Sequence, residues 1–289
     1  MYFDRRARII IWTVSIVIAS ILYVIFFHEG VYIPAKPYLI PLSQKANNIL
    51  ILVFVSALVP STIIEFINSR WLREVEDNIP ILLRDVTETV RSGVPLVRAL
   101  EEASTRNYGP ISKPLEMTMV KFSLTSDFQR VFTWFGEKLI KPSAKRMSSI
   151  LIEAYDSGGR MFDVLETSVE LFSNLAEYRK EKASQMRPYV FVAYLGTFVF
   201  LTISYVVLVR FLVPLAASSV NPLEGQVTLL NNVLDINYYK SILFWAAVME
   251  TLFGGLVAGK MSEGRMKAGL LHSVVLLLIT IIFFNSFKV

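Results

Sequence analysis

The sequence predicts an all-α, polytopic membrane protein with five transmembrane helices and a cytoplasmic bundle of about six helices. The first observation is composition: the 289 residues are 54% hydrophobic and 18% charged, whereas soluble domains carry about 25% charged residues. The second is length, because five apolar stretches each approach the roughly 20 residues that span a bilayer. The third is residues 69–188, a long stretch with the charge and periodicity of water-soluble helices.

The first two spans belong to an N-terminal segment, residues 1–67. Residues 9–27 are apolar and uncharged, and residues 48–67 form the second stretch, with Glu65 at its end. A cleaved signal peptide is the alternative for the first stretch. However, the apolar run is too long for one, and no small-residue cleavage site follows it. We therefore expect this stretch to be retained as a transmembrane helix.

Residues 68–187 are expected to form the bundle, and an apolar stripe marks its first helix. The stripe follows the spacing of one helix face, and its members are Ile79, Leu82, Leu83, Val86 and Val90. Gly93 is expected to end this helix, because glycine adopts the left-handed conformation of a helix C-terminus without steric cost. Pro95 then suits the first turn of the next helix.

Proline and glycine turns divide the rest of the bundle. Ser126 and Asp127 form an expected helix cap. Gly158 and Gly159 break the chain, and at least one of them is expected to need a positive φ. A long helix then runs from residue 162 toward Pro188. The shorter helices are expected at residues 96–105, 115–124, 128–139 and 143–155.

The C-terminal segment, residues 188–289, contains three more apolar stretches, at residues 189–209, 241–258 and 268–287. Glu250 lies near the middle of the fourth span, where a carboxylate is costly and normally faces the protein interior. A proton relay would need a chain of further acids or histidines, so we expect Glu250 to bond to a neighbouring span. Small residues of the same span are expected to allow close helix packing within the molecule, namely Gly254, Gly255 and Gly259.

The distribution of Lys and Arg predicts a cytoplasmic N-terminus and an outside C-terminus. In this orientation the cytoplasmic segments are residues 1–8, the bundle and residues 260–267, and they hold 24 of the 29 basic residues. The flipped orientation would place these basic segments outside. We therefore expect a multi-pass protein of the cytoplasmic membrane. Its net charge of +5 is attributed to this bias and not to nucleic-acid binding.

The sequence contains no enzyme signature: no phosphate-binding loop, no Gly-x-Ser-x-Gly and no metal-ligand spacing. A Gly-Lys pair occurs at Gly259-Lys260, but it lacks the upstream glycines of a phosphate loop. The absence of cysteine excludes disulfides and thiolate sites, and two histidines far apart in sequence do not suggest a metal site. We therefore expect no catalytic residue, no cofactor and no metal.

Several short motifs, taken in order, resemble the type II secretion system F-domain family. The motifs of the bundle are Ile79-Pro80, Leu83-Arg84-Asp85, Arg91-Ser92-Gly93, Pro95-Leu96, Ala99-Leu100, Ser157-Gly158-Gly159 and Leu165-Glu166. The C-terminal motifs are similar to the archaeal flagellar subgroup and the tight-adherence pilus type. They comprise Gly254-Gly255-Leu256-Val257-Ala258-Gly259-Lys260, Gly264 and Gly269-Leu270-Leu271-His272. The resemblance covers most of residues 78–272.

This resemblance implies a platform protein of type IV pili, the archaeal flagellum or type II secretion. Such a protein, held in membrane lipid, docks a cytoplasmic secretion ATPase and transmits its motion to pilin-like subunits. Many family members carry two copies of the helical domain, whereas this chain has one. A homodimer, or pairing with a second F-domain protein, is therefore expected. The alternatives from other classes are a membrane transporter and a membrane-bound sensor or scaffold.

Seven cations near helix turns are the expected ATPase-docking residues. Arginine forms forked bonds to carboxylates, and its planar head loses little freedom on binding. The alternative is that the seven only mark the cytoplasmic side or solubilise the bundle. A second candidate docking region is the long helix around Arg179, Lys180 and Lys182. The seven are Arg84, Arg91, Arg98, Arg160, Lys260, Arg265 and Lys267.

Overall fold

The computed structural model describes residues 5–27, 40–218 and 236–286, and every regular element in these ranges is a helix of α, 3₁₀ or π type apart from one isolated bridge residue. Five of the helices are long and apolar enough to cross a membrane, which confirms the predicted fold class. The contacts divide the described residues into two units. We call Ile67–Gln185 the bundle unit, and Arg5–Phe66 together with Met186–Val289 the span unit.

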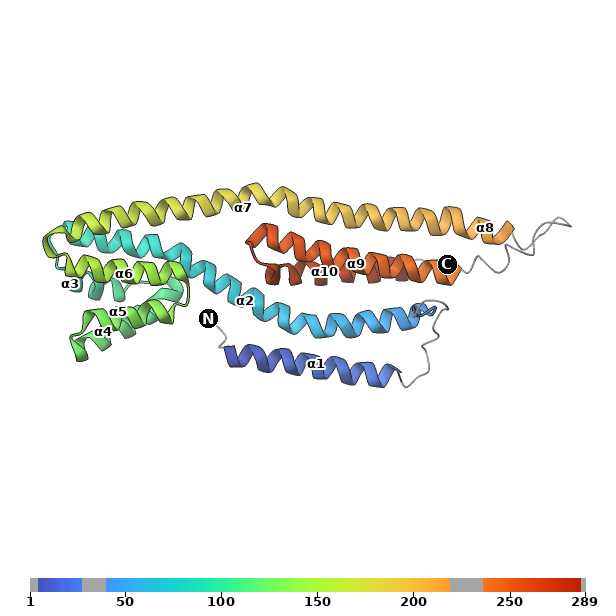
Figure 1. Ribbon diagram of the computed structural model, residues 1–289, viewed down its shortest axis with the longest axis horizontal. Coiled ribbons are helices and arrows are strands. Elements are labelled where there is room, and N and C mark those ends of the chain that lie inside the picture. The colour runs from blue at the N-terminus through green and yellow to red at the C-terminus, as the bar shows by residue number, and fades with distance from the viewer. Residues whose placement is uncertain (1–4, 28–39, 219–235, 287–289) are drawn as a thin grey trace. The chain divides into compact units, whose positions relative to one another are not determined.

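Two helices enter both units (Figure 1): α2, Gln44–Arg91, and α7, Met161–Tyr205. The sequence had suggested a helix ending at residue 67, followed by a separate bundle helix, but α2 is continuous. Residues 66–79 contain neither glycine nor proline, so nothing ends the helix where its composition turns polar. Likewise, α7 passes through Pro188 without a break. A proline in a helix interior removes one backbone hydrogen bond, but its fixed φ is itself helical.

The bundle unit is completed by four shorter α-helices between α2 and α7. Leu96–Ser104 is α3, Ser112–Thr125 is α4, Phe128–Lys138 is α5 and Pro142–Asp156 is α6. Short 3₁₀ turns lie at Gly109–Ile111 and Gly158–Arg160.

Two local features of these helices bear on the predicted boundaries. The α4 helix begins earlier than the expected residue 115, so Pro114 stands in its first turn and not in a loop. The cap before α5 is confirmed, because the Asp127 carboxylate accepts a hydrogen bond from the Arg130 backbone N–H at 2.9 Å.

The core of the bundle unit is built on the predicted apolar stripe of α2. Ile79, Leu82, Leu83 and Val86 are fully buried, and Val90 is nearly so. They pack with buried side chains of the other helices, which include Phe132, Phe135, Leu151, Leu165 and Phe172. Each such side chain contributes about 1.5–3 kcal/mol by leaving water. The core therefore holds α2 and the beginning of α7 within the same bundle.

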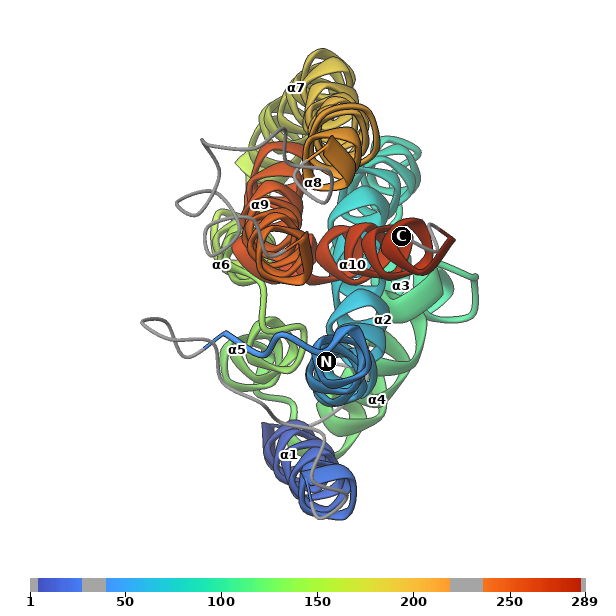
Figure 2. The ribbon, with the colours of Figure 1, turned by 90° about the vertical axis from the view of Figure 1, so that its right-hand side faces the viewer.

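The span unit contains α1, Arg5–Phe27, and the membrane halves of α2 and α7. A π-helical segment, Val206–Leu212, and α8, Val213–Ser218, follow α7. The unit ends with α9, Ile236–Glu263, a 3₁₀ turn at Met266–Ala268, and α10, Gly269–Ser286. Seen end-on in Figure 2, α9 and α10 lie side by side. The core of the span unit includes Ile51 of α2, Leu201 of α7, Phe244 of α9 and Leu277 of α10.

Candidate functional site

Two of the expected docking arginines lie at one end of the bundle unit. Arg91 is the last residue of α2, and its guanidinium donates to Glu166 Oε1 of α7 at 2.6 Å. The same guanidinium carbon lies 5.0 Å from the centre of the Phe162 ring. Arg160 ends the 3₁₀ turn that immediately precedes α7. Arg91 therefore lies at the C-terminus of α2 against the first turns of α7, and Arg160 lies in the turn that leads into α7.

The other two bundle arginines lie apart from this pair. Arg84 stands two turns before Arg91 on α2, in a groove of about 420 Å³ that Glu177 and Lys180 of α7 also line. Arg98 belongs to α3 and is paired with Glu101 at 2.8 Å. Arg84, Arg91 and Arg160 thus lie on the side of the bundle where α2 and α7 meet, whereas Arg98 lies on a separate helix.

All four arginines are exposed, as is Glu166, whereas Glu101 is half-buried. An exposed ion pair contributes about 0–1 kcal/mol to stability. The pairs Arg91–Glu166 and Arg98–Glu101 therefore cost little to exchange for the carboxylates of a partner protein. Breaking these pairs would therefore cost the bundle little stability.

The three membrane-turn cations belong to the span unit and form a second set. Lys260 was expected in a tight turn, but α9 extends to Glu263, so Lys260 lies in the last helical turn. The turn itself is short and centres on Gly264, with a φ of +72°, and Arg265. Lys260, Arg265 and Lys267 are all exposed.

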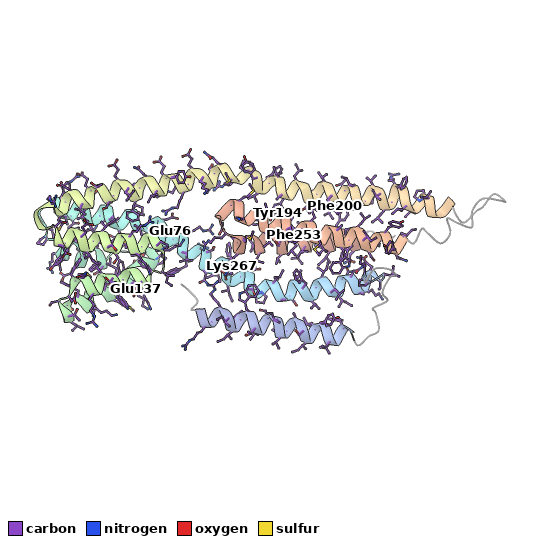
Figure 3. The ribbon with its side chains drawn as sticks, in the orientation of Figure 1. Glu76, Glu137, Tyr194, Phe200, Phe253 and Lys267 are labelled. Atoms are coloured by element: carbon purple, nitrogen blue, oxygen red, sulfur yellow. The ribbon has the colours of Figure 1, made fainter. Side chains whose placement is uncertain are left out.

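Lys267, labelled in Figure 3, lies near the carboxylate of Glu65. From the sequence, Glu65 was expected only to lie at the end of the second span. The Lys267 Nζ is 3.8 Å from Glu65 Oε1 of α2, and Arg8 of α1 donates to the same oxygen. The Glu65 side chain is 11% exposed. This carboxylate therefore joins α1, α2 and the turn before α10 within the span unit.

A polar contact between Asp85 and the loop after α3 was missed in the sequence. The Tyr108 hydroxyl donates to Asp85 Oδ2 at 2.7 Å, and Arg106 Nη1 lies 3.5 Å from the same oxygen. Tyr108 is 2% exposed. Burial, then the hydrogen bond to Asp85 and its negative charge, raise the pKa of Tyr108 to about 12. Asp85 belongs to the motif Leu83-Arg84-Asp85, but a single tyrosine in a loop follows no helix or strand periodicity. The contact between the two residues could therefore not be predicted from the sequence.

The turn glycines differ from one another in backbone conformation. Gly93 has a φ of +92° and Gly158 a φ of +53°, whereas Gly159 does not have a positive φ. A side chain at Gly93 or Gly158 would meet no atom within 4 Å, so the constraint there is the backbone alone. Gly158 is therefore the member of its pair that occupies the region favouring glycine.

The membrane glycines also separate into two kinds. A Cβ at Gly259 would overlap the backbone of Gly269, and one at Gly255 would overlap Ser273. A Cβ at Gly254 would meet nothing within 4 Å. Gly255 and Gly259 therefore lie in a close backbone seam between α9 and α10, and Gly254 lies outside it.

Polar groups of the span unit face α7. A Cβ built on Gly196 of α7 would lie 3.8 Å from Glu250 Oε1, and the Glu250 carboxylate also bonds to the Thr197 side chain. Its second oxygen is buried without a hydrogen-bond partner among the described residues. His272 of α10 is 2.8 Å from the Tyr194 hydroxyl of α7. Within the same described ranges, no three His, Cys, Asp or Glu side chains come together as metal ligands.

The described helices define a class of protein, namely a multi-pass membrane protein with a helical bundle inserted between its second and third spans. Residues 82–209 match the family model described as type II secretion system, protein F. This segment is therefore similar to the F-domain family, as its motifs indicated.

Two relatives come from Methanocaldococcus jannaschii. An uncharacterized protein is 31% identical over 211 residues, which are 72% of this chain and 33% of that protein. Flagella accessory protein J is 22% identical over 270 residues, which are 92% of this chain and 48% of that protein. The chain thus spans between a third and half of the length of these relatives. No solved structure matches it.

Proposed function

We propose that the chain is a membrane platform protein of a type IV pilus-like, archaeal flagellum-like or type II secretion machine. In this role it docks a cytoplasmic secretion ATPase and transmits the motion of that ATPase to pilin-like subunits in the membrane. The family of residues 82–209 and the similarity to a flagella accessory protein support this role. The chain itself is proposed to hydrolyse no ATP and to need no cofactor.

The observation that carries the proposal is the continuity of α2 and α7. Each helix begins or ends in the bundle core and runs without interruption into a membrane span. Hydrogen bonds between successive turns make a helix resist bending, so a force on its bundle end is carried toward its membrane end, although Pro188 of α7 lacks one such bond. A domain tethered by flexible loops could bind an ATPase but would transmit its motion poorly.

Two further proposals concern partners and orientation. Many proteins of this family carry two helical domains and the described residues contain one, so we propose that the chain pairs with a second copy or with another F-domain protein. The basic segments favour a cytoplasmic bundle and N-terminus, with the C-terminus outside. A transporter is the alternative that the intramembrane Glu250 would favour, but its contact with Thr197 also suits simple helix packing.

The proposal is tested by reversing charge at the docking arginines. Arg84, Arg91 and Arg160 are changed together to Glu in the full chain, and binding to the secretion ATPase of the same organism is measured at low and high salt. We expect at least a tenfold loss at low salt, because like charges then face an acidic partner surface. The matched control changes three exposed cations of α4 and α5, Lys113, Arg130 and Lys138, to Glu and is expected to bind normally.

Equal binding by the two triple variants would place the docking surface elsewhere, with Arg179, Lys180 and Lys182 as the next region to test. No binding of the ATPase by the wild-type chain, alone or with a second F-domain protein, would contradict the platform role. Solute flux through vesicles that contain the purified chain would then favour a transporter.

A further inference from the structure

A groove of about 690 Å³ lies between α2, α6 and α7 within the bundle unit. Its apolar lining comes from Ile150 of α6 and from Leu171, Phe172 and Leu175 of α7. Phe172 belongs to the core, but Leu171 is 51% exposed and Leu175 37% exposed. Two leucines four residues apart lie on the same helix face, so they form an apolar ridge along the groove.

The groove contains one acidic side chain among its lining residues, and that carboxylate is already engaged. Glu76 of α2, labelled in Figure 3, has Lys141 Nζ at 3.1 Å and Arg179 Nη1 at 3.9 Å. The Ser143 hydroxyl donates to the same carboxylate oxygen at 3.3 Å. Two cations therefore offset the single negative charge of Glu76.

Two further cations line the groove with no ion pair among the described residues. Lys145 and Arg146 are neighbours on α6, and both are exposed. Together with Arg179, they give the groove an excess of positive charge beside its exposed leucines. Exposed leucines lower the solubility of a protein, and neighbouring cations repel one another. A partner that covers the leucines and supplies negative charge would relieve both effects.

We propose that this groove binds an acidic amphipathic helix of a partner protein. Apolar residues of such a helix, at i, i+4 and i+7, would cover Leu171 and Leu175, as in other helix-in-groove complexes. Its flanking carboxylates would meet Lys145, Arg146 and Arg179, which supplies complementary charge. A nucleic acid would use the cations but leave the leucines exposed. The groove contains none of the seven cations proposed for ATPase docking, although Arg179 also belongs to the second candidate docking region. The peptide test below needs no ATPase, so it can fail independently of the proposed function.

The test uses the full chain in nanodiscs of zwitterionic phosphatidylcholine. The probe is a fluorescein-labelled synthetic helix with leucines at i, i+4 and i+7 and glutamates on both flanks, and its binding is followed by anisotropy. A second peptide replaces the glutamates by lysines, and a third replaces the leucines by serines. We expect each replacement to weaken binding at least tenfold, because the groove offers both an apolar surface and positive charge.

Variants of the chain locate the binding. Lys145→Glu with Arg146→Glu is expected to raise the Kd of the acidic peptide at least tenfold. The matched control, Lys113→Glu with Arg130→Glu, makes the same change in charge on α4 and α5 and is expected to leave the Kd within twofold. Leu171→Ser with Leu175→Ser tests the ridge and is expected to weaken binding at least fivefold. Thermal unfolding of each variant checks that the bundle is intact.

Three outcomes would overturn the inference. The first is equal loss of binding in the groove variant and in its matched control, which would indicate nonspecific charge attraction. The second is full binding of the serine peptide, because the leucine ridge would then have no role. The third is groove-dependent binding of soluble dioctanoyl phosphatidylglycerol in place of the acidic peptide, which would assign the site to a lipid headgroup.

Discussion

Tyr108 is a buried side chain whose hydroxyl reports on the contact between α2 and the loop after α3. Its pKa of about 12 lies above the ordinary tyrosine value, because burial and Asp85 disfavour the phenolate. The neutral phenol therefore stabilises the fold fully below pH 10, and this contribution, about 2–3 kcal/mol, is lost as pH rises from 10 toward 12. We expect the phenolate absorbance of wild type minus Tyr108→Phe to titrate near pH 12. Titration near pH 10 would show that Tyr108 is neither buried nor in contact with Asp85.

At the same scale, the glycine pair after α6 offers an internal comparison. Gly158→Ala places a Cβ in the left-handed region and is expected to destabilise the chain by about 1 kcal/mol. Gly159→Ala meets no neighbour and has no positive φ, so it is expected to be neutral or slightly stabilising. Thermal unfolding of the detergent-solubilised chain measures both. A larger loss for Gly159→Ala than for Gly158→Ala would contradict the assigned turn.

Among the helices, the pair α9 and α10 depends on backbone contact at glycine. Gly259→Ala forces a methyl group against the Gly269 backbone and is expected to cost about 1–3 kcal/mol or more, because neither helix can yield locally. Gly254→Ala, in the same helix but facing open space, is the control and is expected to change stability by less than about 0.5 kcal/mol. Yield in the membrane and the unfolding temperature in detergent are the measurements. Equal effects of the two substitutions would argue against the seam.

At the scale of the helices, some features could be predicted from the sequence and others could not. The five spans and the apolar stripe on α2 could be predicted, because length and periodicity are local properties. The continuity of α2 was missed, since a change from apolar to polar residues resembles a boundary, although residues 66–79 contain no glycine or proline that would favour a helix end there. The contact of Asp85 with Tyr108 joins residues 23 apart in sequence, and the groove joins three helices. Neither can be inferred from local patterns.

For the whole molecule, the orientation in the membrane decides whether the bundle can meet a cytoplasmic partner. The prediction is that a cysteine replacing Asn174, an exposed residue of the bundle unit, is protected from a membrane-impermeant maleimide in intact cells. A cysteine replacing Leu229, which lies outside the described residues, is expected to be labelled. The natural chain has no cysteine, so each variant carries a single reactive thiol.

The physical reason for this orientation is the cost of placing basic segments on the outer side. Permeabilised cells supply the control, because the cysteine at position 174 should then react as fully as the one at position 229. Labelling at position 174 in intact cells, with position 229 protected, would place the bundle outside. The docking arginines of the bundle and the groove around Glu76 would then face the wrong compartment for an ATPase, and the platform role would fail with the orientation.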